Sequence, residues 1–407
     1  MIFIKIAWSN LFRNYRRTIS TLLAILVGVG VIVFVNGFND GISSSWSNGI
    51  INGRSGHFRL RHKQYNDFAS TDMEKILIAD PARLKEELKK NPHVTAAASR
   101  VLISGLAGQE EKSTTFIGAG YEMEELSTVL PLFGSGIVAG EGLEPGDPMG
   151  AVLGKALAES LNAKIGDELV ILSNSIYGEQ NAIVVYIKGL VTIPGAIQIE
   201  QSLILTSIDQ VQTDLLDIDA GATEIMVRID DVKNLEAVVN WVNDHFSKQG
   251  EPWVAIPWYD DQMFRQAMGF FRGIATLISI ILSLVVGIVI SNALLMSIFE
   301  RIREIGTMRA VGTEKWQVYR IFYAEALITT FIGIMLGMLL GALVTWVTGE
   351  IGIEVPGLAQ GMPIHPRVFL KNLVNSAILP VIVVCIAIIF PIRSSCKMDV
   401  VNALNYR

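Results

Sequence analysis

The side chains that most often catalyse reactions or bind metals are few and scattered in this sequence. The five histidines are His57, His62, His93, His245 and His365. No two of them have the helical spacing of a metal site, and no zinc-binding spacing of cysteines exists. The nucleophile motif Gly-x-Ser-x-Gly and the zinc motif His-Glu-x-x-His are also missing. We therefore expect no catalytic residue and no metal site in this chain.

One segment partly matches a phosphate-binding loop. Residues 150–156 read Gly-Ala-Val-Leu-Gly-Lys-Ala, which is one residue shorter than that motif. Ala156 stands where a Ser or Thr hydroxyl would bind Mg²⁺. Because both the spacing and the hydroxyl are wrong, we expect this chain to hydrolyse no ATP and to bind no cofactor itself.

The most informative polar segment runs from Glu300 to Gly312 and reads Glu-Arg-Ile-Arg-Glu-Ile-Gly-Thr-Met-Arg-Ala-Val-Gly. Ile302, Ile305 and Met308 recur at helical spacing among the charges, and the final glycine is typical of a helix end. The pattern predicts a short helix with an apolar face that could dock on a partner protein. The alternative is a solvated, charged loop.

This segment lies between long apolar stretches. The chain has 407 residues, of which 51% are hydrophobic, and its mean hydropathy is +0.43. Four stretches, 18–38, 273–299, 323–347 and 374–390, come close to the roughly 20 residues that cross a bilayer as a helix. The expected fold is therefore a membrane α-helical protein with four transmembrane helices. The net charge of −6 gives no sign of a nucleic-acid partner.

Basic residues predict the orientation of these spans. Lys and Arg are enriched before the first span, in the loop 300–322 and in the tail 391–407, so these parts and both termini are expected in the cytoplasm. Residues 39–272 and 348–373 then lie outside. The first stretch could instead be a cleaved signal peptide, but its apolar core is too long and lacks a cleavage site. Residues 1–17 are expected to form a cytoplasmic amphipathic helix on the membrane surface, or else to extend the first span.

The segment 39–272 is expected to be a large extracytoplasmic α+β domain inserted between helices 1 and 2. Strand patterns cover 57–62, 94–106, 114–119, 168–172, 182–193, 202–205, 223–229 and 254–256. Helix patterns cover 80–90, 151–162, 207–216 and 230–248. A polar helix from about residue 259 is expected to run without a break into the second span, where it could transmit motion.

Two groups of residues in the spans suggest packing and cargo binding. Gly333, Gly337 and Gly341 form a small-residue face that lets another helix approach closely; the alternatives are lipid exposure or packing within the chain. Bulky apolar residues also gather in the outer halves of the first two spans: Val33, Phe34, Phe38, Met263, Phe264, Met268 and Phe271. They are predicted to line a cavity for acyl chains, or alternatively to pack the helices or face lipid.

Taken together, these motifs resemble the MacB/FtsX-like permeases of ABC transporters. The polar segment matches that family's pattern R-x-R-E-I-G-x-x-R-A-x-G over residues 301–312, and residues 322–326 match its pattern F-x-x-E-A. The tail 391–407 is similar to the family's C-terminal motif, although Val400 stands where proline is usual. The arrangement of the spans and the size of the insert agree as well.

The resemblance implies a non-catalytic permease subunit of a mechanotransmission-type ABC transporter in the bacterial inner membrane. Its implied partners are membrane lipid, a second permease copy or a homologous permease, and a separate ATPase subunit that binds ATP and Mg²⁺. The residues implied to form the ATPase-coupling helix are Glu300, Arg301, Arg303, Glu304, Gly306, Arg309 and Gly312. The insert would combine a porter-like part with a smaller lobe at about 126–216.

Within this group, residues 55–61, Ser-Gly-His-Phe-Arg-Leu-Arg, are most similar to the lipoprotein-releasing LolC/LolE type. That type implies extraction of lipoproteins from the outer leaflet of the inner membrane and their transfer to a periplasmic lipoprotein carrier. The stretch 166–185 is short for the carrier-binding hook of LolC. A MacB-like exporter of another amphipathic cargo and an FtsX-like signalling scaffold for a cell-wall hydrolase are the alternatives. The length of the insert favours export.

Overall fold

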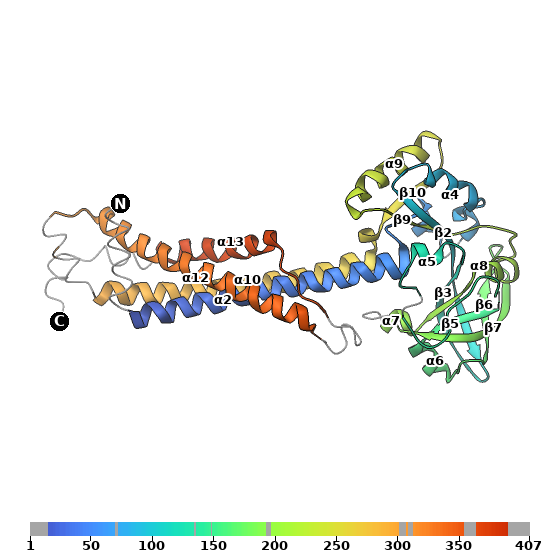
Figure 1. Cartoon of the computed structure of the whole chain (residues 1–407), viewed down its shortest axis with the longest axis horizontal. Helices are drawn as coiled ribbons and strands as arrows, with labels where there is room; N and C mark the ends of the chain where they lie inside the picture. Colours follow the sequence, from blue (N-terminus) through green and yellow to red (C-terminus); the bar gives the residue numbers. More distant parts are fainter. Residues whose placement is uncertain are drawn as a thin grey trace. The chain divides into compact units, whose positions relative to one another are not determined.

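The structure is a computed structural model that describes residues 15–69, 72–133, 136–147, 149–192, 197–300, 307, 312–353 and 364–389 (Figure 1). It divides into two compact units. Among the described residues, the helical unit comprises those within 15–43, 266–353 and 364–389, and the α+β unit comprises those within 44–265. An insert between the first and second long helices was predicted, and this division confirms it.

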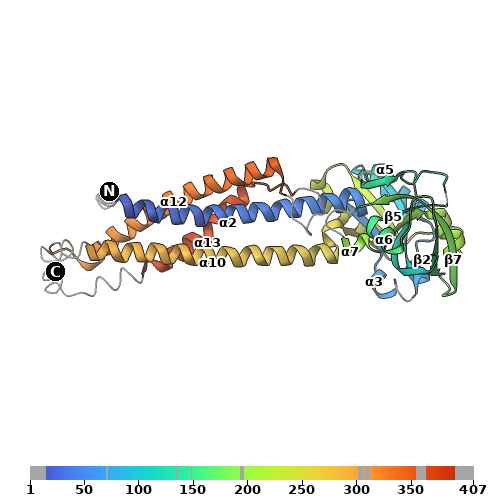
Figure 2. The ribbon, with the colours of Figure 1, turned by 90° about the horizontal axis from the view of Figure 1, so that it is seen from below.

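The helical unit is built from α2 (Tyr15–Ile50), α10 (Gln262–Glu300), α12 (Lys315–Ile351) and α13 (Leu370–Ala387), which lie side by side (Figure 2). Three helical stretches are long and apolar enough to cross a membrane: Thr18–Ser55, Phe264–Glu300 and Trp316–Ile351. The apolar part of α13, Leu373–Ala387, is shorter. The described residues thus show three helices of full length, and the fourth span stays a prediction.

One part of the α+β unit is an antiparallel sheet covered by helices. Its strands, in spatial order, are β10 (Trp253–Pro257), β1 (Phe58–His62), β9 (Glu224–Ile229) and the first half of β2 (Val94–Gln109). The helices α4 (Pro81–Lys89) and α9 (Leu235–Lys248) bury their apolar residues in the same core as these strands. In α9 these are Leu235, Val238, Val239, Val242 and Phe246, the spacing of one helix face.

The other part is a closed ring of strands that shares β2. The second half of β2 pairs with both β3 (Lys112–Tyr121) and β6 (Glu168–Asn174). From β3 the ring continues through β8 (Leu203–Ser207), β5 (Gly150–Gly154) and β7 (Gln180–Val191), and β7 pairs with β6. Closure leaves the ring without an open edge, and its interior is filled by apolar side chains. The ring draws on β2 and β3, which precede the predicted lobe 126–216.

The remaining elements are short. They are η1 (Ile51–Ser55), α3 (Tyr65–Phe68), η2 (Met73–Ile76), α5 (Leu126–Val129), β4 (Ile137–Gly140), α6 (Lys155–Leu161), α7 (Ile197–Glu200), α8 (Ile208–Gln210), η3 (Val211–Leu216), η4 (Val232–Asn234) and η5 (Trp258–Asp260). The helix predicted over 151–162 was wrong in its first turn, because residues 150–154 form β5. Every residue of β5 is buried, so its apolar run reads equally well as a helix or a strand.

Candidate functional site

Most of the predicted coupling residues lie outside the described part of the chain, namely Arg301, Arg303, Glu304, Gly306 and Arg309. Their flanks are described. Glu300 ends α10, and Gly312 has a φ of +103°, which suits glycine. A capping box between Glu314 and Gln317 then starts α12. The segment therefore connects two well-defined helix ends, and its docking to an ATPase stays a prediction.

The three glycines of α12 face α2 of the same chain. A Cβ atom on Gly333 would lie 2.7 Å from the side chain of Ile25, and one on Gly337 would lie 2.8 Å from Val29. A Cβ on Gly341 would lie 2.7 Å from the carbonyl oxygen of Gly30. The small residues thus let α12 and α2 pack closely within one chain, which is one of the alternatives that the sequence left open.

The predicted cavity residues lie in different surroundings. Val33 is buried in the core of the helical unit, and Phe34 stacks on Phe38 with ring centroids 6.2 Å apart. Phe264 packs on Trp258 at 5.2 Å. Met268 is buried and Phe271 is half-buried, whereas the side chain of Met263 lies outside the described atoms. Cargo binding by this set stays a prediction.

An extended segment that the sequence analysis did not predict crosses two helices of the helical unit. The backbone N–H of Arg367 donates to the carbonyl of Gly37 in α2 at 3.0 Å. His365 Nδ1 lies 2.7 Å from the carbonyl of Gly349 in α12. Backbone atoms of His365 and Pro366 lie so close to Gly41 and Gly349 that a Cβ on either glycine would collide, and the carbonyl oxygen of Arg367 would lie 3.1 Å from a Cβ on Gly37. Residues 364–367 therefore contact both α2 and α12 just before α13 begins.

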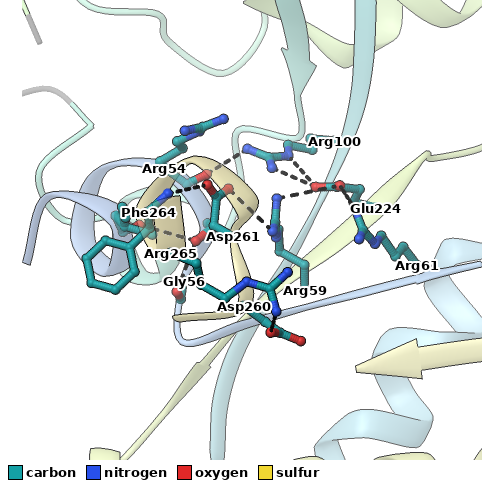
Figure 3. A network of polar contacts seen from close by, with 12 residues as sticks. Arg54, Gly56, Arg59, Arg61, Arg100, Glu224, Asp260, Asp261, Phe264 and Arg265 are labelled. Carbon is teal, nitrogen blue, oxygen red and sulfur yellow. Dashed lines mark hydrogen bonds and ion pairs between the residues drawn. The ribbon is translucent and has the colours of Figure 1, made fainter. Parts of the chain in front are cut away.

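A second site, which the sequence analysis missed, is a network of buried charges in the α+β unit (Figure 3). Its centre is Glu224 at the start of β9, whose exposed fraction is 0%. Arg100 on β2 donates two hydrogen bonds to Glu224 Oε2, at 3.1 and 2.6 Å. The third nitrogen of Arg100 donates to the backbone oxygen of Arg54 at 2.6 Å. Since Arg54 lies in η1, Arg100 anchors the segment that directly follows α2.

Arg59 on β1 extends the network toward the residues that precede α10. Its terminal nitrogens lie 3.9 Å from Glu224 Oε1 and 3.7 Å from Asp261 Oδ2. The other carboxylate oxygen of Asp261 accepts a hydrogen bond from the N–H of Phe264 at 3.2 Å, which caps the first turn of α10. Arg61 also approaches Glu224 Oε1, at 3.9 Å. The network thus connects the segment after α2, the sheet and the start of α10.

Glu224 and Arg100 stabilise each other's charged form. Burial by itself would raise the pKa of Glu224, but Arg100 and Arg59 outweigh it, and the pKa lies below its usual range. Burial would likewise lower the pKa of Arg100, yet Glu224 raises it overall. Burial, followed by the charge of Glu224, raises the pKa of Tyr65 to about 12. Three arginines therefore surround one buried carboxylate and stabilise its charge.

The sequence indicates only the basic residues of this network and not their acidic partners. The strand pattern at 57–62 places Arg59 and Arg61 on alternate positions, and such charges are usually expected on an exposed strand face. In the structure β1 lies between β9 and β10, and Arg59 is buried. Its acidic partners lie more than 160 residues away along the chain, so periodicity could not find them.

Comparison with known proteins identifies both parts of the chain. Residues 18–245 match the family model of the MacB-like periplasmic core domain, and residues 276–400 match the FtsX-like permease C-terminal family. The lipoprotein-releasing system transmembrane protein LolC of Neisseria meningitidis serogroup B is 22% identical over 284 residues, which cover 65% of this chain and 67% of LolC. The macrolide export ATP-binding/permease protein MacB of Bordetella avium is 31% identical over 137 residues, or 32% of this chain and 19% of MacB.

Among solved structures, the periplasmic region of MacB from Actinobacillus actinomycetemcomitans is 15% identical and has a TM-score of 0.35. That similarity covers 54% of this chain and 95% of the MacB region. The extracellular domain of the transporter YknZ from Gram-positive bacteria gives a TM-score of 0.34 at 14% identity, over 49% of this chain and 98% of that domain.

Proposed function

The chain belongs to the family that combines a MacB-like periplasmic core domain with an FtsX-like permease domain, and from this we propose that it is the permease subunit of a mechanotransmission-type ABC transporter. The observation that carries the proposal is the order of the parts. The α+β unit is inserted between two long apolar helices, and the segment 300–312, which resembles the family's pattern, directly follows the second of them. This order lets one continuous helix connect an outer domain to a cytoplasmic partner.

We propose that ATP and Mg²⁺ are bound by a separate ATPase subunit, with two permease copies, or this chain and a homologous permease, in one complex. The segment 150–156 supports the proposal that ATP is bound by another subunit and not by this chain. The N–H of Ala156, which a phosphate would need, donates instead to the carboxylate of Glu200 at 3.2 Å. A carboxylate at that position repels a phosphate group.

The proposed setting is the bacterial inner membrane, with both termini in the cytoplasm and α13 as the fourth span. The enrichment of basic residues on one side supports the orientation. The 18 residues of α13 extend about 27 Å, close to the roughly 30 Å of a bilayer core. Pro380 within α13 is compatible with a span because neighbouring helices can satisfy the freed carbonyl.

The coupling segment provides the test of the permease proposal. Replacing Glu304 and Arg309 together by alanine is expected to remove at least about nine tenths of the ATPase that co-purifies with the chain, or to uncouple its hydrolysis, because both charges at the proposed docking face are lost. The measurement is the amount of ATPase recovered with the tagged chain, followed by its hydrolysis rate. Glu350→Ala, at the other end of α12, is the control. Unchanged recovery and unchanged coupled hydrolysis in the double variant contradict the proposal.

For the cargo, we propose lipidated proteins of the outer leaflet, which a periplasmic carrier then accepts. The pattern at residues 55–61 and the similarity to LolC support this choice. The alternatives are export of another amphipathic cargo, as the MacB relatives suggest, and a signalling scaffold for a cell-wall hydrolase. The α+β unit of residues 44–265 favours export, because the resemblance implies much smaller inserts for scaffolds of the division type.

A photo-crosslinker separates these cargoes. At Phe34 it is expected to capture a lipidated protein in the absence of ATP, and addition of ATP is expected to reduce that product several-fold. Phe331 on α12, whose exposed fraction is 64%, is the control position and should capture phospholipid alone. Crosslinked products are identified by mass spectrometry. Phospholipid alone at both positions, in a complex that hydrolyses ATP, rules out lipoprotein extraction through this face and favours the scaffold.

A further inference from the structure

Arg59 stands between two acids that belong to different parts of the chain. We propose that Arg59 is a positioning residue of the transport cycle, which couples the first turn of α10 to the sheet of the α+β unit through its pair with Asp261. The proposal rests on the proposed function, since it names the contact through which movement of a membrane helix reaches the outer domain.

Helix α10 is continuous over its whole length. This helix runs for 39 residues from Gln262 to Glu300, where the predicted coupling segment begins. At 1.5 Å per residue it spans roughly 58 Å. Its backbone hydrogen bonds make it stiff along its axis, so a displacement at one end is passed to the other. The first turn of α10 is therefore the place where such a displacement arrives.

Asp261 contacts α10 and the sheet through different oxygens of its carboxylate. Oδ1 caps α10 by accepting the N–H of Phe264 at 3.2 Å, while Oδ2 faces a terminal nitrogen of Arg59 at 3.7 Å. The backbone oxygen of Asp261 also accepts the N–H of Arg265 at 3.0 Å. Asp261 thus moves with the helix, and its charge is presented to the sheet. Asparagine caps helices about as well as aspartate, so the two contacts can be separated by substitution.

Arg59 and Arg100 differ in how closely their guanidinium groups are held. Arg100 is fixed by three hydrogen bonds of 2.6 to 3.1 Å. Arg59 meets both of its acids at 3.7 to 3.9 Å, beyond hydrogen-bond length, and its Nε has no hydrogen-bond partner among the described residues. A small displacement of Asp261 can therefore shorten one ion pair of Arg59 and lengthen the other. Arg100 is an anchor, whereas Arg59 can exchange between Glu224 and Asp261.

Arg59 lies on a strand that has a neighbouring strand on each side. In β1 it lies opposite Ile256 of β10 and Met226 of β9, so it is held by strands on both sides. Its side chain is buried, where charges attract one another more strongly than in water. A force on this guanidinium is thus transferred to the centre of the sheet rather than to a flexible loop.

The test uses Asp261→Asn in the full-length chain with its co-purified ATPase, in lipid nanodiscs. Spin labels at Tyr177 and Phe331, both exposed, report the distance between the α+β unit and α12, which lies outside the proposed coupling path, after Cys385 and Cys396 are replaced by serine. Wild type is expected to change this distance when ATP and vanadate are added. In Asp261→Asn the change is expected to fall at least about fivefold, while basal ATP hydrolysis stays within about twofold.

The controls separate coupling from structure. Asp260→Asn removes an exposed pair with Arg265, at 2.7 Å, and should keep the full distance change. Arg59→Gln should lose the change, Arg59→Lys should keep most of it, and the double variant Arg59→Gln/Asp261→Asn should be no worse than either single variant. A purely structural role would instead lower the yield of folded chain and the thermal stability of the variants.

The outcomes are distinct. If wild type hydrolyses ATP without any distance change, the proposed mechanotransmission fails, and this inference fails with it. If wild type changes its distance and Asp261→Asn and Arg59→Gln change it equally, the role assigned to Arg59 is overturned while the permease proposal stands.

Discussion

Replacing Glu224 by glutamine is expected to lower the free energy of unfolding of the α+β unit by about 3–5 kcal/mol. Glu224 is fully buried, and three arginines approach its carboxylate. Glutamine has nearly the same volume, so the packing around it is retained. The loss is therefore electrostatic: the buried arginines keep their charges but have no buried counter-charge on β9.

The measurement is denaturant unfolding of the full-length chain in detergent, followed by the fluorescence of Trp241, Trp253 and Trp258, which pack on the core of the sheet. Glu251→Gln is the matched control. It removes a partly exposed pair with Arg83, at 2.9 Å, and should cost at most about 1 kcal/mol. If both variants unfold at the same denaturant concentration, Glu224 does not hold the network together.

Replacing Gly341 by leucine is expected to destabilise the helical unit by about 3 kcal/mol, near the upper end for an overpacked core. A Cβ at this position would lie 2.7 Å from the carbonyl oxygen of Gly30 and 2.7 Å from the Cβ of Val33. A carbonyl oxygen of the main chain cannot rotate away as a side chain can. Helix α12 must therefore move away from α2, and both lose close contacts.

Thermal stability of the detergent-solubilised chain, read by size-exclusion chromatography after heating, measures this effect. Gly269→Leu in α10 is the control, because a Cβ there meets no atom within 4 Å. The control should melt within a few degrees of wild type, whereas Gly341→Leu should melt well below it. Equal melting temperatures would show that α2 and α12 do not pack through this glycine in the membrane protein.

The sequence by itself determined the elements that depend on local composition. Long apolar runs predicted the three helices that are long enough to cross a membrane, since crossing a bilayer requires about 20 apolar residues in a row. Alternation predicted β1 and most of β2, and the spacing of Gly333, Gly337 and Gly341 marked a close-packing face. The motif at 301–312 pointed to the family, which the comparisons confirmed.

Only the tertiary structure decided which distant segments meet. The ring closes because β2 pairs with β6, and the strand pattern of either one fits many partners. Arg59 and Glu224 read as surface charges until the fold buries them side by side. The physical reason is that periodicity reports the environment of each residue along one helix or strand. An ion pair, a closed ring or a helix crossing is an interaction between segments, and its partners are selected by packing over the whole chain.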